Sequence, residues 1–235
     1  MSNPILQINN LNQYYGESHT LWDLDVEINK GECTILMGRN GVGKTTFLQC
    51  IMGLLPIRSG EILFENNDIS KKVADQRARM GIGYVPQGRQ IFPLFTVKEN
   101  LQIGLTARDD KATTIPEFIY ELFPVLKEML SRRGGDLSGG QQQQLAIGRA
   151  LATDPKLLIL DEPTEGIQPN IVAEIGDIIL KLNQDIGLTV LLVEQKFPFA
   201  RRVGGQFLIM DRGRNVAIGA MNTLSDGLVK KYLTV

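Results

Sequence analysis

A glycine-rich loop that ends in a lysine and two threonines is the part of this sequence best suited to bind phosphates. Its residues are Gly38, Arg39, Asn40, Gly41, Val42, Gly43, Lys44, Thr45 and Thr46. Glycines let the backbone turn tightly, so that successive N–H groups can point at phosphate oxygens. Lys44 can place a positive charge on the β- and γ-phosphates, and the Thr45 hydroxyl can bind Mg²⁺. The loop therefore predicts a site for a nucleoside triphosphate and Mg²⁺.

Two adjacent carboxylates could complete such a site. Asp161 and Glu162 follow the apolar run 157–160, and paired carboxylates at the end of a buried strand are costly unless a cation lies nearby. Asp161 suits a contact to Mg²⁺. Glu162 suits polarising the attacking water, because phosphoryl transfer needs positioning more than covalent participation. The alternative is a solvated acidic turn at the end of a strand.

A second glycine-bearing segment lies well downstream of the first. It contains Ser138, Gly139, Gly140 and Gln141. A helix that begins with small residues can bind phosphate at its N-terminus, although serine is also a common cap of ordinary helices. The chain therefore carries two candidate phosphate-binding segments.

The elements that must hold these residues follow an alternating pattern. Short apolar strands are expected at 34–37, 157–160, 189–193 and 207–210, with helices near 44–53 and 170–182. This alternation predicts an α/β core with a mostly parallel sheet covered on both faces. Strands at 5–8 and 21–28 predict an N-terminal antiparallel β subdomain. Residues 92–153 show helical signals, including a capping box at Thr96 and Glu99, and predict an inserted α-helical subdomain within one domain of 235 residues.

Composition limits the possible partners. Apolar residues make up 43% of the chain, charged residues make up 22%, and the net charge is −1. Such a chain has no overall field to attract nucleic acid, so no nucleic-acid partner is expected. No segment approaches the roughly 20 apolar residues that cross a bilayer. Cys33 and Cys50 lack the spacing of metal ligands, so we expect two buried, reduced thiols.

From Tyr15 to about Gly213 the chain resembles the nucleotide-binding subunits of ATP-binding cassette (ABC) transporters, which are P-loop NTPases with a RecA-like core. The resemblance implies ATP and Mg²⁺ as cofactors. It implies that Tyr15 stacks on adenine and that Gln87 reaches Mg²⁺ and the attacking water. It also implies that two chains pair head to tail, so that the signature segment, residues 138–141, closes over the nucleotide of the other chain.

Two positions depart from the family pattern. Gln195 stands where family members commonly carry a histidine. A glutamine amide can donate a hydrogen bond to a γ-phosphate oxygen, but it cannot carry charge. Gln168 replaces an aspartate that often bridges the two chains of the dimer.

The segments 141–144, 162–169 and 193–195 resemble the subfamily that takes up branched-chain amino acids and amides. Within that subfamily, residues 85–89 and 165–168 are most similar to the urea-transport ATPase. We therefore predict an ATP-hydrolysing subunit that energises a urea importer; the alternative solutes are branched-chain amino acids or short amides. The resemblance implies a cytoplasmic protein on the inner face of the membrane. Its implied partners are a second ATPase chain, permease subunits and, indirectly, a solute-binding protein.

The apolar residues Ile91, Phe92, Leu94 and Phe95 predict either a permease-docking surface or ordinary core packing. Two non-transport cassettes fit less well. A repair ATPase needs a long coiled coil between Lys44 and the signature segment, and the interval between Lys44 and Ser138 is too short for one. A translation factor normally carries two cassettes, whereas this sequence shows one. A GTPase is disfavoured because the asparagine–lysine–x–aspartate motif that reads guanine is absent.

Overall fold

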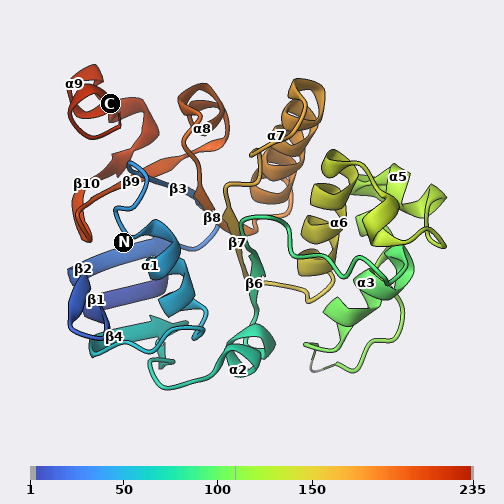
Figure 1. Cartoon of the computed structure of the whole chain (residues 1–235), viewed down its shortest axis with the longest axis horizontal. Coiled ribbons are helices and arrows are strands. Elements are labelled where there is room, and N and C mark those ends of the chain that lie inside the picture. The colour runs from blue at the N-terminus through green and yellow to red at the C-terminus, as the bar shows by residue number, and fades with distance from the viewer. Residues whose placement is uncertain (1–3, 109, 234–235) are drawn as a thin grey trace.

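The computed structural model describes residues 4–108 and 110–233. Its larger sheet has the strand order β10-β9-β3-β8-β7-β6 (Figure 1). The strands are β3 (Cys33–Met37), β6 (Ile82–Val85), β7 (Leu157–Asp161), β8 (Thr189–Val193), β9 (Gln206–Asp211) and β10 (Arg214–Ala220). Only the pairing of β10 with β9 is antiparallel among these described strands. The mostly parallel core sheet is thus confirmed.

A smaller, fully antiparallel sheet has the order β2-β1-β4-β5. Its strands are β1 (Pro4–Tyr15), β2 (Ser18–Asn29), β4 (Ser59–Phe64) and β5 (Asn67–Asp68). The hairpin of β1 and β2 is longer than the alternation predicts. Register shifts between Ile8 and Leu11, and again up to Tyr14, interrupt the period-2 pattern. The strand continues through these bulges, although the alternation of apolar and polar residues that predicts it is broken there.

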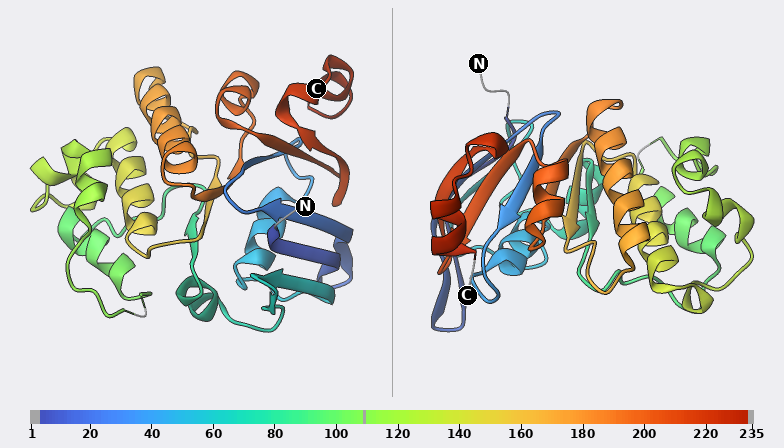
Figure 2. Two further views of the ribbon diagram at one scale, coloured as in Figure 1. Left: turned by 180° about the vertical axis from the view of Figure 1, so that it is seen from behind. Right: turned by 90° about the horizontal axis from the view of Figure 1, so that it is seen from above.

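Helices cover both faces of the larger sheet (Figure 2). Around the core lie α1 (Lys44–Ile51), α2 (Ala74–Arg79), α7 (Pro169–Gln184), α8 (Phe197–Val203), η2 (Met221–Thr223) and α9 (Asp226–Tyr232). A group of helices at one side of the molecule comprises α3 (Val97–Leu105), α4 (Glu117–Leu122), α5 (Pro124–Glu128), η1 (Gly134–Asp136) and α6 (Gly139–Leu151). The capping box at Thr96 is present, with Glu99 N donating to Thr96 Oγ1 at 3.2 Å and Thr96 N donating to Glu99 Oε2 at 2.7 Å.

Two hydrophobic cores sandwich the larger sheet. Leu157 and Ile159 pack with Phe47 of α1 and with the antiparallel sheet. Leu158 and Leu160 face the other way and join the core that contains α3, α6 and α7. Each central strand is buried along its whole length, because successive side chains point to opposite faces and both faces are covered. The described part of the chain has no helix whose length and apolar character would let it cross a membrane.

Candidate active site

The phosphate loop connects the end of β3 to the start of α1. Gly43 precedes α1 with φ +106°, and a Cβ there would lie 2.8 Å from Leu21 Cδ2. Gly41 has φ +78° with open space where a Cβ would stand. Both backbone conformations favour glycine. The glycines therefore let the chain wrap around the N-terminus of α1, as the sequence predicts.

Lys44 lies inside this loop and is only 6% exposed. Its Nζ donates to the carbonyl oxygens of Gly38 at 2.8 Å and Arg39 at 2.9 Å. Burial lowers the pKa of Lys44, while the nearby charges of Glu162 and Asp161 act in the opposite direction. A buried ammonium flanked by carboxylates and carbonyls fits a site that receives further negative charge, such as a triphosphate.

Asp161, at the end of β7, is 2% exposed and accepts a hydrogen bond from Thr45 Oγ1 at 3.4 Å, across 116 residues of sequence. Burial raises the pKa of Asp161 to about 6, with a second contribution from the charge of Glu162; the Thr45 hydrogen bond and Lys44 oppose the rise. A hydroxyl and a carboxylate oxygen together form a donor set that suits Mg²⁺.

Within residues 4–108 and 110–233, no group of three or more His, Cys, Asp or Glu side chains is arranged to hold a metal by itself. Mg²⁺ usually binds through one or two carboxylates, substrate phosphates and water. The pair of Thr45 and Asp161 fits that mode of binding.

Glu162 meets Gln195 and Asn40 at the carboxyl ends of the parallel strands. Gln195 Nε2 donates a short hydrogen bond to Glu162 Oε1 and another to Asn40 Oδ1 at 2.8 Å. The three residues follow β7, β8 and β3, which are neighbours in the sheet. Parallel topology brings these strand ends to one edge. The predicted contact of Gln195 with a γ-phosphate stays a prediction, since its amide here holds Glu162 and Asn40.

Gln87 follows β6 and donates from Nε2 to Glu165 Oε2 at 2.9 Å. Its amide nitrogen therefore engages the loop after Glu162. The predicted contact of Gln87 with Mg²⁺ and water stays a prediction.

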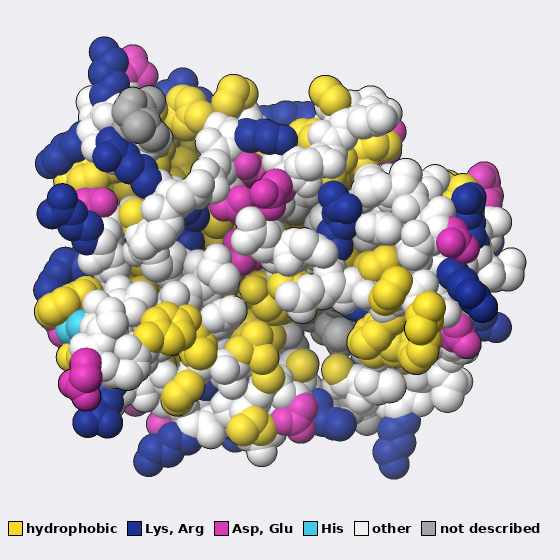
Figure 3. Space-filling model, viewed as in Figure 1, with side chains coloured by type: hydrophobic (Ala, Val, Ile, Leu, Met, Phe, Trp, Pro, Cys, Tyr) yellow, Lys and Arg dark blue, Asp and Glu magenta, His cyan; other side chains and the backbone are white. Residues whose placement is uncertain are grey.

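A cavity of about 560 Å³ lies over these residues. Its lining comprises Thr20, Asn40, Gly41, Gly43, Lys44, Thr45, Thr46, Gln87, Glu162, Thr164, Glu165, Glu194, Gln195 and Lys196. Figure 3 shows acidic side chains gathered near the middle of the same face, where the loops after β7 and β8 lie. Sequence reasoning did not include Thr164, Glu165 or Glu194 in the site. Their only signal is adjacency to Glu162 and Gln195.

Tyr15 lies at the end of β1, 49% exposed, with its hydroxyl 3.5 Å from Thr46 Oγ1. The ring is therefore next to the phosphate loop, although it does not line the cavity. Its stacking on adenine remains a prediction.

The signature segment lies at a different place. Ser138 caps α6, with Gln141 N donating to Ser138 Oγ at 3.3 Å and Ser138 N donating to Gln141 Oε1 at 3.0 Å. These residues line a second cavity of about 440 Å³ together with Gly139, Gly140 and Gln168. The two cavities share no lining residue. A single chain thus keeps its two glycine-rich segments apart.

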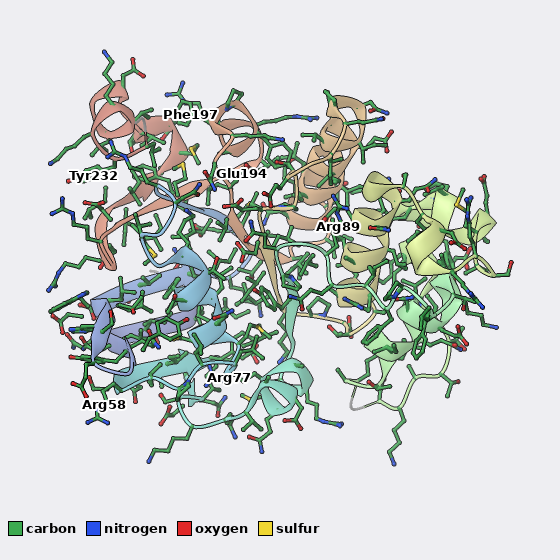
Figure 4. The ribbon with its side chains drawn as sticks, in the orientation of Figure 1. Arg58, Arg77, Arg89, Glu194, Phe197 and Tyr232 are labelled. Atoms are coloured by element: carbon green, nitrogen blue, oxygen red, sulfur yellow. The ribbon has the colours of Figure 1, made fainter. Side chains whose placement is uncertain are left out.

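Arg89 lies between the signature segment and the loop after Glu162 (Figure 4). Its guanidinium donates to Gln142 Oε1 and to the carbonyl oxygen of Glu165, both at 3.4 Å. These hydrogen bonds connect the N-terminal turn of α6 with the loop that carries Glu162.

Comparison with known proteins gives consistent results. The family model described as ABC transporter matches residues 21–165. The chain is similar to the high-affinity branched-chain amino acid transport ATP-binding protein BraG of Pseudomonas aeruginosa, with 41% identity over 90% of this chain and 91% of the relative. It is also similar to the probable branched-chain amino acid transport ATP-binding protein LivF of Archaeoglobus fulgidus, with 37% identity over 91% of each chain.

Solved structures agree with these relatives. A nucleotide-free ATP-binding cassette from an ABC transporter superposes with a TM-score of 0.82 and 29% identity, over 98% of this chain and 95% of that chain. A dimeric cassette in a post-hydrolysis state, bound to ADP and Pi, superposes with a TM-score of 0.81 and 26% identity, over 93% of this chain and 100% of that chain.

Proposed function

Since the chain belongs to the ATP-binding subunits of ABC transporters, we propose that it hydrolyses ATP to energise an importer of branched-chain amino acids. The family couples ATP hydrolysis to transport. The observation that carries the proposal is the convergence of Lys44, Thr45 and Glu162 on one cavity, with Asp161 hydrogen-bonded to Thr45 beside it.

Each of these residues has a role in the proposed reaction. Lys44 binds the phosphates, and Thr45, Asp161 and Gln87 would hold Mg²⁺. The ion, when bound, neutralises charge on the β- and γ-phosphates. Glu162 orients the attacking water and takes up its proton as the water oxygen bonds to the γ-phosphorus and the bond to the β–γ bridging oxygen breaks.

We also propose a head-to-tail dimer. The separation of the signature cavity from the phosphate-loop cavity supports it, since residues 138–141 do not line the cavity of their own phosphate loop. A dimeric solved cassette with the same fold gives independent support. In this arrangement the signature segment of one chain completes the ATP site of its partner.

The proposed solute rests on two relatives, the branched-chain amino acid transport ATP-binding protein BraG and the probable branched-chain amino acid transport ATP-binding protein LivF. They favour the sequence-based alternative over urea, for which neither relative gives support. The solute itself would be selected by permease subunits and a solute-binding protein.

Permease docking is proposed on the segment between β6 and α3. Phe92, Leu94 and Phe95 are exposed, and Figure 3 shows hydrophobic side chains gathered on the face near α3. Ile91 instead packs against the hydrophobic core that contains α3, α6 and α7. For that residue, the alternative of ordinary core packing applies. Docking there would place the chain on the inner face of the membrane.

Uptake measurements test this function. The chain would be co-expressed with its permease and binding-protein partners, and uptake of labelled leucine and urea compared with that of Lys44→Ala cells. Leucine uptake that depends on Lys44 is expected. Urea uptake with no leucine uptake would replace the proposed solute, and ATP turnover with neither would contradict the importer role.

A further inference from the structure

Glu194 is a buried carboxylate that no step above uses. It directly follows β8 and is 3% exposed, near the centre of the molecule (Figure 4). Its Oε2 accepts a hydrogen bond from Thr164 Oγ1 at 2.7 Å. Its Oε1 accepts from the backbone N–H groups of Gln195 and Lys196, both at 2.8 Å. Both carboxylate oxygens are therefore engaged.

These hydrogen bonds join two loops of the active site. Thr164 lies two residues after Glu162, and Gln195 directly follows Glu194. A second connection runs in the opposite direction, from Lys196 Nζ to the carbonyl oxygen of Thr164 at 2.9 Å. A buried carboxylate is costly unless hydrogen bonds compensate it. Here its three donors come from the two loops whose relative position determines whether Gln195 can reach Glu162.

We propose that Glu194 is a positioning residue of the ATPase site, which holds the side-chain amide of Gln195 against Glu162. Gln195 Nε2 has two N–H groups, and they donate to Glu162 and Asn40. This geometry requires a fixed main chain at Gln195, and Glu194 provides it by binding the backbone N–H groups of the turn. The inference rests on the proposed role of Glu162 and on the predicted action of Gln195 in the ATPase site.

The chemistry of the hydrogen bonds determines which variants are informative. Glu194→Met has a similar length but cannot accept the three hydrogen bonds. Glu194→Gln can still satisfy them, because its amide oxygen accepts from the backbone and its NH₂ group can donate to the Thr164 hydroxyl, which both donates and accepts. Thr164→Val removes the hydroxyl at similar shape, while Thr164→Ser keeps it. Glu128→Met, on the exposed surface of α5, is the matched control.

The experiment measures kcat for ATP hydrolysis and the Kd for ATP of each purified variant, with thermal unfolding as a check of folding. Glu194→Met and Thr164→Val are expected to lower kcat by about 10- to 100-fold, the scale of a small misplacement of a reacting group, with the Kd for ATP within about twofold of wild type because the phosphate loop is untouched. Glu194→Gln, Thr164→Ser and Glu128→Met should stay near wild type. If Glu194→Met fails to fold, the Thr164 pair tests the same connection from the other loop.

A double-mutant cycle separates positioning from a general structural effect. In a Gln195→Ala background, Glu194→Met should lower kcat no further, since the residue through which it acts is gone. Hydrogen exchange at the Gln195 and Lys196 amides should become faster in Glu194→Met and remain slow in Glu194→Gln.

Three results would overturn the inference. They are wild-type kcat in folded Glu194→Met, an equal loss of kcat in Glu194→Gln, and an undiminished loss in the Gln195→Ala background. Wild-type turnover in Gln195→Ala alone would instead remove the proposed role of Gln195, so the two failures are distinguishable.

Discussion

Arg77 should be among the residues on which the stability of the phosphate-binding helix depends most. It projects from α2, is 2% exposed, and reaches the C-terminal end of α1. Its guanidinium donates to the carbonyl oxygens of Cys50 and Ile51 at 2.7 Å, of Lys72 at 2.8 Å and of Ser70 at 3.2 Å. A cation at this end of a helix is favourable, because the last carbonyls lack partners within the helix.

Truncation to alanine would remove all four hydrogen bonds. The Cys50 carbonyl oxygen would keep the backbone N–H of Gly53 at 3.1 Å, whereas the buried Ile51 carbonyl oxygen would lose the guanidinium. Hydrogen bonds to charged groups are each worth about 1.5–3 kcal/mol. They do not add, because the variant no longer buries a charge. A buried acceptor that loses its partner costs about 1–3 kcal/mol, and we expect Arg77→Ala to lower the free energy of unfolding by about that amount. The loss is large beside a total of about 5–15 kcal/mol.

Urea unfolding followed by circular dichroism measures this loss directly. Arg79→Ala, on the same helix but exposed, is the matched control and should change the free energy of unfolding by less than about 0.5 kcal/mol. Arg77→Lys should fall between the two, because one ammonium cannot reach four carbonyls. A loss below about 1 kcal/mol for Arg77→Ala would refute the reasoning, since removal of the guanidinium from these carbonyls would then cost almost nothing.

The remaining predictions of this group concern the thiols and the active site. Burial raises the pKa of the Cys33 and Cys50 thiols from 9.0 to about 12, so both should resist iodoacetamide in the native protein and react in denaturant; rapid native labelling would contradict this. Because the unfolded thiols lose their protons first, the free energy of unfolding should fall as the pH rises from about 9 towards 12; no decline in urea titrations of the wild type relative to a double Cys→Ser variant would argue against it. Lys44→Ala should lose ATP binding in isothermal titration calorimetry, whereas unchanged affinity would remove the residue from the phosphate site. Gln195→His should add to kcat a dependence on pH near about 6.5, the ordinary histidine pKa, beyond any that wild type shows; identical pH profiles would show that this position does not act on the reaction.

The sequence predicts which residues meet at the candidate site better than it predicts the hydrogen bonds that connect them. The positions of Lys44, Asp161 and Glu162 can be predicted from the sequence. Phosphate and Mg²⁺ binding restrict both the type of residue and its place after a strand. Glu194 and Arg77 have no such signal. Charged residues usually lie at the surface. Glu194 and Arg77 are instead buried, and each hydrogen-bonds to a segment distant in sequence; Thr164 and Glu194, for example, lie 30 residues apart.

The fold likewise has features that the sequence predicts and features that it does not. Apolar runs locate the central strands, since both sheet faces are covered, whereas bulges hide the full length of β1. The signature segment is found in the sequence by the glycines after Ser138 and by its resemblance to ABC transporter subunits. Only three dimensions show that it lines a cavity apart from the phosphate loop.

The most direct test of the proposed site uses the Glu162→Gln variant. Its rate of ATP hydrolysis is measured together with the molecular mass of the protein in solution in the presence of ATP and Mg²⁺. The variant keeps the shape of the side chain but cannot take up a proton. We expect turnover to fall by at least about 100-fold, while ATP still binds and the mass corresponds to a dimer. Wild-type turnover by this variant would contradict the role of Glu162, and an ATP-bound monomer would contradict a site completed by a second chain.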